Sequence, residues 1–332
     1  MSIQNSVLYS SLIVSGILFQ AATLSPARAA ESELGSSKEA ENYMSNDYER
    51  AAVLAMPKFQ AADLSRKFEE IRKKYPRGSD TITVHHLREL EKVFALPAGD
   101  FKSDATYYDN GKVAYEVNPA SGRVAIVFNT DDLPSLNKAK AKELAPQVIR
   151  EQKEYLKKLG IDTTQVLFSE SGFMYQQTSS KKGSSLVPPS EVEVDSIFSY
   201  GLRALEGILV DGSHFRLASK APQKLDTLAV RWPRFEFHPL IKSFEIRSAN
   251  ELIKEAAGKI RVSAHSNKVN VKMAVVFRPV LYKGQQTFIP SLRVGVRPDN
   301  GEAGEIFYLN LIHQALEFQE FEQTDRPMST TG

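Results

Sequence analysis

The stretch ATYYDNGKVAYEVNPASGRVAIVFN, from Ala105 to Asn129, constrains the fold more than any other part of the chain. Apolar and polar residues alternate in it over short runs, which is the period of a strand with one buried face. Asp109-Asn110-Gly111 and residues 118–122 interrupt these runs with turn-forming side chains at hairpin spacing. The stretch therefore predicts three antiparallel strands, whose apolar face needs a covering layer.

Helical patterns precede and separate the strand patterns. Apolar residues recur near a spacing of 3.6 in residues 59–75, and similar patterns cover 85–96, 134–159 and 248–260. In the helix at 134–159 we expect Ser135 as the N-cap, Gly160 just after the end, and a kink or a break at Pro146. Strand patterns follow the last two helices. The predicted fold class is therefore α+β, a helix packed on an antiparallel β meander, with the unit repeated about twice.

The N-terminus has the pattern of an export signal. SVLYSSLIVSGILFQAATL is apolar, and Ala27-x-Ala29 after it fits the small-residue rule, so we expect cleavage between Ala29 and Ala30. The segment before the apolar run has no Lys or Arg, which leaves an uncleaved anchor as the alternative. The apolar core is shorter than the ~20 residues of a spanning helix. We therefore predict a secreted or periplasmic protein with no transmembrane span in the mature chain.

Changes in pattern along the chain predict its division. We expect a signal peptide at 1–29, a flexible leader at 30–46 and a disordered tail at 321–332. Between them the predicted units are N-terminal helices with a short β meander at 47–133, a helix with an antiparallel sheet at 134–245, and a second such unit at 246–320.

Composition removes several classes of protein. The chain has no cysteine, which excludes disulfide scaffolds, thiolate metal sites and cysteine nucleophiles. An exported chain of this kind is typical of bacteria. Its 42 basic and 40 acidic residues are closely balanced, so we expect no nucleic-acid partner that relies on a broad basic face.

The segment Asp211-Gly212-Ser213-His214 resembles a fragment of a hydrolase site. However, consecutive residues of a strand point to opposite faces, so Ser213 and His214 cannot form a dyad with each other. Asp-Gly between two apolar runs is typical of a type I′ hairpin turn. We therefore predict that Asp211-Gly212, together with Gly207, reverses the chain.

Other short motifs give no catalytic residue. Ser135-x-x-Lys138 and Ser179-x-x-Lys182 match a serine-enzyme box, but its companion boxes are missing. The six histidines show no metal-binding spacing, and phosphate-binding loops are absent from the sequence. We predict no catalytic residues, no metal and no cofactor. A pair of carboxylates far apart in sequence would not be visible to this reasoning, so a hydrolase remains open.

RWPRFEFHP, from Arg231 to Pro239, is the candidate contact segment. A strand would place Trp232, Arg234 and His238 on one face, and Trp and Arg are common anchors of protein interfaces. These three residues are the predicted binding residues. The alternative is that Trp232 packs under a loop at the sheet edge.

Three stretches resemble parts of known exported domains. YEVNPASGRVAIVF, from Tyr115 to Phe128, resembles a strand-turn-strand of PepSY domains, and RSANELIKEAAGKI, from Arg247 to Ile260, resembles the helix that precedes their strands. Residues 199–218, with Gly207, Val210, Gly212 and Ser213, are similar to a segment of thermolysin-type propeptides. The resemblance implies a cystatin-like α+β fold, export, and a role in binding or restraining a peptidase or another envelope protein. Because the chain contains no H-E-x-x-H, a peptidase partner would act in trans.

The expected function is that of an exported, non-catalytic binding protein with a protein partner. A peptidase inhibitor and an envelope folding or regulatory factor are the forms that the resemblance implies. The alternative is a secreted hydrolase whose acid and base are dispersed along the sequence.

Overall fold

The computed structural model describes residues 44–45, 48–79, 81–94, 106–118, 121–130, 132–176, 181–182, 185–186, 192–263, 269–298 and 304–321. The predicted signal peptide at 1–29, with its cleavage site at Ala29-Ala30, lies outside the described residues. So do the predicted leader except Met44–Ser45, and the predicted tail beyond Phe321.

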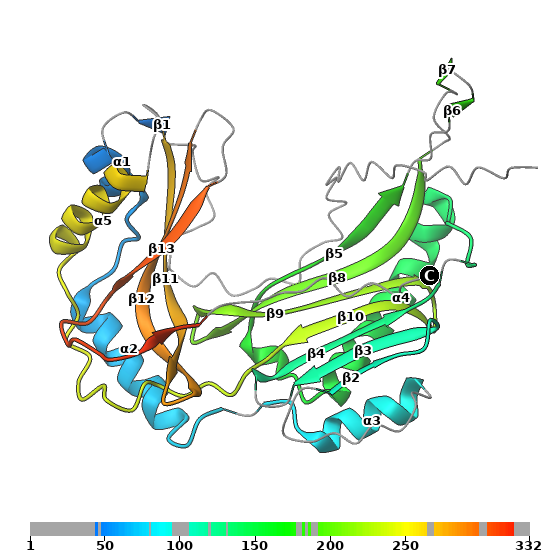
Figure 1. Ribbon diagram of the computed structural model, residues 1–332, viewed down its shortest axis with the longest axis horizontal. Coiled ribbons are helices and arrows are strands. Elements are labelled where there is room, and N and C mark those ends of the chain that lie inside the picture. Colours follow the sequence, from blue (N-terminus) through cyan, green and yellow to red (C-terminus); the bar gives the residue numbers. More distant parts are fainter. Residues whose placement is uncertain are drawn as a thin grey trace, which may run out of the picture.

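Helices and strands account for most of the described chain (Figure 1). The helices are α1 (Tyr48–Ala55), α2 (Ala61–Lys74), α3 (Val84–Phe94), α4 (Lys138–Lys158), the 3-10 helix η2 (Thr163–Gln165) and α5 (Ala249–Ser263). The strands are β1 (Met44–Ser45), β2 (Thr106–Asp109), β3 (Val113–Asn118), β4 (Arg123–Phe128), β5 (Val166–Gln176), β6 (Lys181–Lys182), β7 (Ser185–Leu186), β8 (Glu193–Leu205), β9 (Ile208–Ala221), β10 (Lys224–Arg231), β11 (Val269–Tyr282), β12 (Gln285–Pro298), β13 (Glu305–Asn310) and β14 (Gln319–Glu320).

The predicted fold class is wrong. In place of a small helix-on-meander unit repeated about twice, the described strands form one large mixed sheet of twelve strands and a separate two-stranded pair. Its main path runs β13-β12-β11-β9-β10-β4-β3-β2, and β1, β5, β8 and β14 pair beside this path. Strands that we assigned to separate units therefore belong to the same sheet.

Strand β9 explains the difference. It pairs antiparallel with β8 and β10, but Leu209 and Val210 also pair in parallel with Val276 and Phe277 of β11. Hairpins leave turn residues in the sequence, whereas two strands this far apart in the chain leave no local signal of their pairing. This parallel contact joins the β2–β10 part of the sheet to the β11–β13 part.

Helices cover one face of each part, and the other faces meet at the junction. Phe215 and Leu217 of β9 pack in a core with leucines of α3 and α4, so His214 and Arg216 point to the opposite, helix-free face. In the other part, a second core joins β11–β13 to α1, α2 and α5. In Figure 1, α1 and α5 lie on the side of β11–β13 that faces away from β5–β10. The helix-free faces therefore line the inside of an angle whose vertex is the contact of β9 with β11.

Several local predictions are confirmed. Helices α2 and α3 lie where the 3.6-residue patterns predict them, and β2, β3 and β4 form the expected antiparallel run.

Helix α4 is not split at Pro146. Its N-cap is Asn137, whose side chain accepts a hydrogen bond from the Lys140 N–H at 2.8 Å, so the assignment of the cap to Ser135 is wrong.

The chain reverses before Asp211-Gly212. Glu206 and Gly207 have φ of 49° and 79° and form the tight turn between β8 and β9, as a type I′ hairpin requires. Gly207 is therefore confirmed as a turn residue. Asp211 and Gly212 instead lie inside β9, where Gly212 has φ of 74° and the register with β8 is interrupted. The pairing of β9 with β11 at Leu209 and Val210 lies just before this interruption, and β9 pairs with β8 again from His214 onward.

Candidate functional site

A cavity of about 510 Å³ lies where the two helix-free faces meet. We call it the junction cavity. Strands of both parts line it: Tyr200 and Leu202 of β8, Asp211, Gly212 and His214 of β9, Arg278 and Pro279 of β11, Arg293 of β12, Ile306 and Tyr308 of β13, and Glu320 and Phe321 at β14. The segment Asp211–His214 therefore contributes to a cavity, although it contributes no Ser-His pair.

Asp211 is the central acceptor of the junction cavity. The Tyr308 hydroxyl donates a hydrogen bond to Asp211 Oδ2, and Arg293 Nε lies 3.7 Å from the same oxygen. Burial raises the pKa of Tyr308 well above its ordinary value, and the bond to Asp211 raises it further. The phenol therefore stays protonated at neutral pH and serves as a donor.

Arg293 keeps most of its donors available. Its side chain is 40% exposed, and its guanidinium donates no hydrogen bond to any described residue. Tyr200 also lines the cavity. Burial raises the pKa of Tyr200 above its ordinary value, and the positive charge of Arg293 opposes part of this shift. The Tyr200 hydroxyl also has no hydrogen-bond partner among the described residues. The guanidinium of Arg293 and the hydroxyl of Tyr200 donate no hydrogen bond to a described residue. Together they form a set of donors for an anionic group.

Arg278 and Glu320 close one side of the junction cavity. The guanidinium of Arg278 pairs with the Glu320 carboxylate, and its side chain is only 11% exposed. The Arg278 guanidinium carbon also lies 4.6 Å from the centre of the Tyr308 ring and 5.3 Å from that of Phe318. This stacking holds β14 against β11 and β13.

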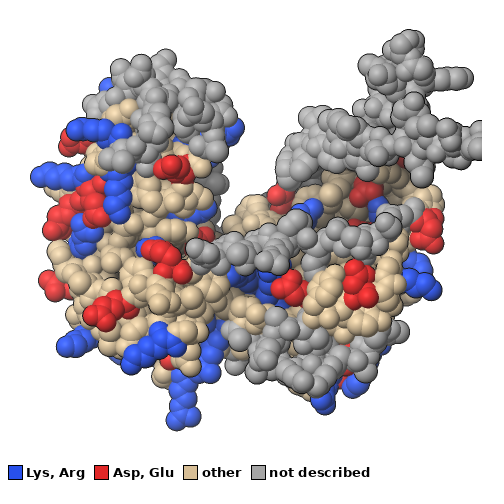
Figure 2. Space-filling model, in the orientation of Figure 1, with Lys and Arg blue, Asp and Glu red and all other residues tan. Residues whose placement is uncertain are grey.

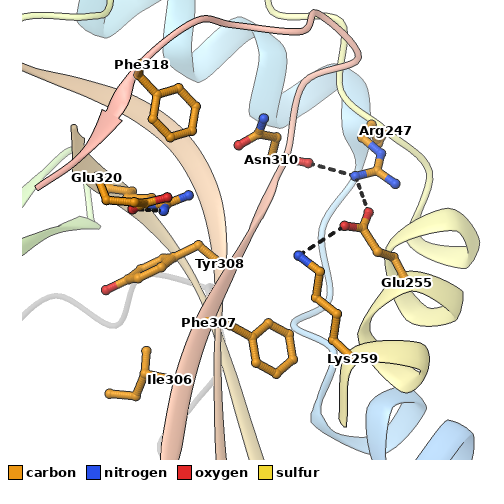
Figure 3. A pocket seen from close by; sticks show the side chains of 10 residues that line it. Arg247, Glu255, Lys259, Ile306, Phe307, Tyr308, Asn310, Phe318 and Glu320 are labelled. Atoms are coloured by element: carbon orange, nitrogen blue, oxygen red, sulfur yellow. Dashed lines mark hydrogen bonds and ion pairs between the residues drawn. The ribbon is translucent and has the colours of Figure 1, made fainter. Parts of the chain in front are cut away.

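A second hollow of about 540 Å³ runs beside β13, and we call it the edge groove. It shares Arg278, Ile306, Tyr308 and Glu320 with the junction cavity. Figure 3 shows side chains of α5 on one side of β13 and Tyr308 with Glu320 on the other. In the space-filling view, Lys and Arg side chains are visible at the floor of the hollow between the two parts of the molecule (Figure 2).

Trp232, the first of the predicted binding residues, does not lie on the surface. It is only 2% exposed and packs in the core under α3 and α4. The Arg203 guanidinium lies 4.8 Å from its ring centre and donates hydrogen bonds to Gln165 Oε1 at 2.9 Å, the Pro233 carbonyl at 2.6 Å and Ser79 Oγ at 2.7 Å. The strand reading of RWPRFEFHP is wrong beyond Arg231, because the chain leaves β10 there. Trp232 is therefore a core side chain in the described structure.

The other two predicted binding residues do not join Trp232 in one site. Arg234 is exposed, and its Nε lies 3.8 Å from Glu236 Oε2. His238 is 1% exposed, with Nε2 3.1 Å from the Glu317 carbonyl and Nδ1 3.3 Å from the Leu240 N–H. None of the three lines the junction cavity or the edge groove.

Ser213 and His214 point to opposite sides of β9, as strand geometry predicts. Ser213 is 1% exposed and its hydroxyl has no hydrogen-bond partner among the described residues, whereas His214 lines the junction cavity. Within the described ranges, no three His, Cys, Asp or Glu side chains gather as a set of metal ligands. In the same ranges, no helix combines the length and apolar character needed to cross a bilayer.

No protein-family model matches the chain, and no curated protein matches it significantly. The resemblance to PepSY domains and thermolysin-type propeptides therefore stays a prediction.

Sequence reasoning missed the residues that line the junction cavity, apart from Asp211, Gly212 and His214. Arg278, Arg293 and Tyr308 lie in three strands whose alternation shows only that their side chains avoid the apolar face. An Arg at the centre of a long apolar strand is the one signal that could have drawn attention to Arg278 and Arg293.

Proposed function

We propose that the protein is an exported, non-catalytic binding protein whose junction cavity takes a ligand with one carboxylate and an adjacent apolar group. The single observation that carries the proposal is the unused donor set of Arg293 and Tyr200 inside a cavity. Export is supported by the N-terminal apolar run and the Ala27-x-Ala29 motif.

A carboxylate suits the charges of the junction cavity. A guanidinium presents parallel N–H groups that match the two oxygens of a carboxylate. Asp211 and Glu320 already balance Arg293 and Arg278, so a doubly charged anion would be repelled more strongly than a singly charged one. The apolar group would contact Ile306, which is 53% exposed, and the other carbon-rich side chains of the lining.

The lining favours binding over chemistry because its reactive groups are engaged. Tyr308 is held protonated by burial and by Asp211, which makes it a poor base. Ser213, the nearest hydroxyl in sequence to His214, points away from it. The donors of Arg293 and Tyr200, with apolar side chains such as Leu202 and Ile306 beside them, are the usual content of a binding site.

Calorimetry with two probes tests the proposal. N-acetylphenylalanine and its amide differ only in the carboxylate, and we expect the chain from Ala30 onward to bind the acid about tenfold more tightly or better, as a charge-assisted bidentate contact is worth. Arg293→Gln should remove this preference. Arg297→Gln is the matched control, since Arg297 is exposed on the same strand and does not line the cavity.

Two outcomes would contradict the proposal. Equal affinity for the acid and the amide, or equal loss in the Arg293 and Arg297 variants, would remove the carboxylate site. Chemical conversion of a bound probe, followed by mass spectrometry, would contradict a non-catalytic role. Export has its own test, because N-terminal sequencing of the exported protein should give Ala30 as the first residue.

A further inference from the structure

Strand β13 has one edge without a strand partner. It pairs with β12 along its whole length and ends the path of the sheet in the described part of the chain. The Leu311 N–H donates to the Pro290 carbonyl at 3.1 Å, which fixes the alternation of the antiparallel ladder. The N–H and C=O groups of Phe307 and Leu309 therefore face β12, and those of Ile306 and Tyr308 face outward.

The outward groups lie in the edge groove. Just beyond them, the Asn310 carbonyl accepts a hydrogen bond from Arg247 Nη1 at 3.2 Å, which confirms the outward direction of this set. No described residue pairs with the main chain of Ile306 or Tyr308 on this side. An edge strand with free main-chain groups and an exposed Ile306 is a template for another strand.

The two walls of the groove differ in chemistry. On the α5 side, Lys259 is 47% exposed and shares Glu255 with Arg247, at 3.5 Å and 2.8 Å respectively. On the other side, Tyr308 and Phe318 enclose the Arg278–Glu320 pair (Figure 3). The α5 wall therefore has one positive charge in excess, and the other wall is aromatic.

We propose that the edge of β13 is a strand-addition site for an extended segment of a partner polypeptide, with acidic residues facing Lys259 and apolar residues facing Tyr308 and Phe318. Alternate side chains of an added strand point to opposite faces, so one segment can satisfy both walls. The two walls stand on either side of β13, so an added strand would lie between them (Figure 3). The proposal adds a surface to the proposed binding function. The edge groove shares Ile306 and Tyr308 with the junction cavity, but the strand site does not use the Arg293 and Tyr200 donors of the carboxylate site.

Six-residue peptides in which Glu alternates with Val or Phe, acetylated and amidated at their ends, are the probes. We expect calorimetry to show binding to the chain from Ala30 onward and weaker binding when Lys replaces Glu. Methylation of one alternate set of peptide amide nitrogens should weaken binding about tenfold, and methylation of the other set should have little effect. Amide hydrogen exchange at Ile306 and Tyr308 should slow when peptide is present.

Ile306→Pro is the matching change in the protein. It removes an outward N–H without removing a bond to β12, and Pro is tolerated at sheet edges. We expect it to weaken peptide binding about tenfold, whereas Ile306→Thr keeps the N–H and most of the affinity.

Three outcomes would overturn the proposal: no binding by any alternating peptide, binding that is indifferent to both amide methylation sets, or a dimer in sedimentation that Ile306→Pro abolishes. The last would make a second copy the occupant. Arg293→Gln should leave peptide binding intact, so failure of the carboxylate site and failure of the strand site can be told apart.

Discussion

At the scale of single residues, Arg203 shows how a charged side chain becomes part of a core. Its exposed fraction is 0%, and its hydrogen bonds reach three segments that are distant in sequence, at Ser79, Gln165 and Pro233. Sequence alone could not identify this role, because an Arg in a strand is ordinarily expected on the solvent face. Only the arrangement of the three segments supplies the acceptors.

Arg203→Ala should lower the free energy of unfolding by about 3–5 kcal/mol, since it leaves several buried polar groups without a partner. Urea unfolding followed by circular dichroism measures this. Arg234→Ala, at an exposed position two residues beyond Trp232, should change stability by about 0.5 kcal/mol or less. Similar losses in both variants would contradict the role assigned to Arg203.

Ser213→Ala should leave the protein at least as stable as the wild type. The buried hydroxyl has no partner among the described residues, so removing it relieves a desolvation cost of about 1 kcal/mol. Carboxylate binding should also be unchanged, because Ser213 points away from the junction cavity. A large loss of stability or of affinity would show that the hydroxyl has a partner or a function.

His238 should make stability depend on pH. Burial lowers the pKa of His238, although the hydrogen bond to the Glu317 carbonyl opposes the shift. Between the lowered folded pKa and the unfolded value of about 6.5, the unfolded chain binds more protons, so stability falls as pH falls below about 6.5. Urea unfolding between pH 7.5 and 5 should show a shallower fall in His238→Gln than in the wild type.

At the scale of elements, patterns within a segment predicted well and pairings between distant segments did not. The 3.6-residue spacing located α2 and α3, and turn residues located β2 to β4, because each signal is contained within the element itself. A glycine stands at both positions, at Gly207 where the chain reverses and at Gly212 where the pairing of β8 with β9 is interrupted. Only the register of β8 with β9 distinguishes them.

One substitution at two glycines tests this distinction. Gly207→Ala should lower the free energy of unfolding by about 1–2 kcal/mol, because Gly207 has φ of 79° in a tight turn. Gly258→Ala in α5 should raise it by about 0.5–1 kcal/mol, since a Cβ there meets nothing within 4 Å and Ala favours helix. Effects of the same sign in urea unfolding would contradict the turn assignment.

At the scale of the whole molecule, the parallel contact of β9 with β11 couples the two parts of the sheet. Val210 is 2% exposed and belongs to the core of the β11–β13 part, while the same strand continues into the other part. The site follows from this joint, because the junction cavity takes its lining from strands of both parts. For the same reason the site could not be predicted before the joint was known.

Val210→Ala should lower the stability of both parts together, by about 2 kcal/mol. Hydrogen exchange with mass spectrometry measures this as equal loss of protection in β3–β4 and in β11–β12. Val117→Ala in β3, also buried, should give the same shared loss from the other side. A loss confined to the part that carries the substitution would show that the two parts unfold separately.

The contact of Arg203 with Trp232 has a practical consequence. Trp232 is the single tryptophan of the chain, and it lies against a buried guanidinium that connects three distant segments. Its intrinsic fluorescence is therefore a label that the protein already carries at this connection. Nearby cations alter indole emission, so its wavelength and intensity should report the loss of this connection when the molecule unfolds.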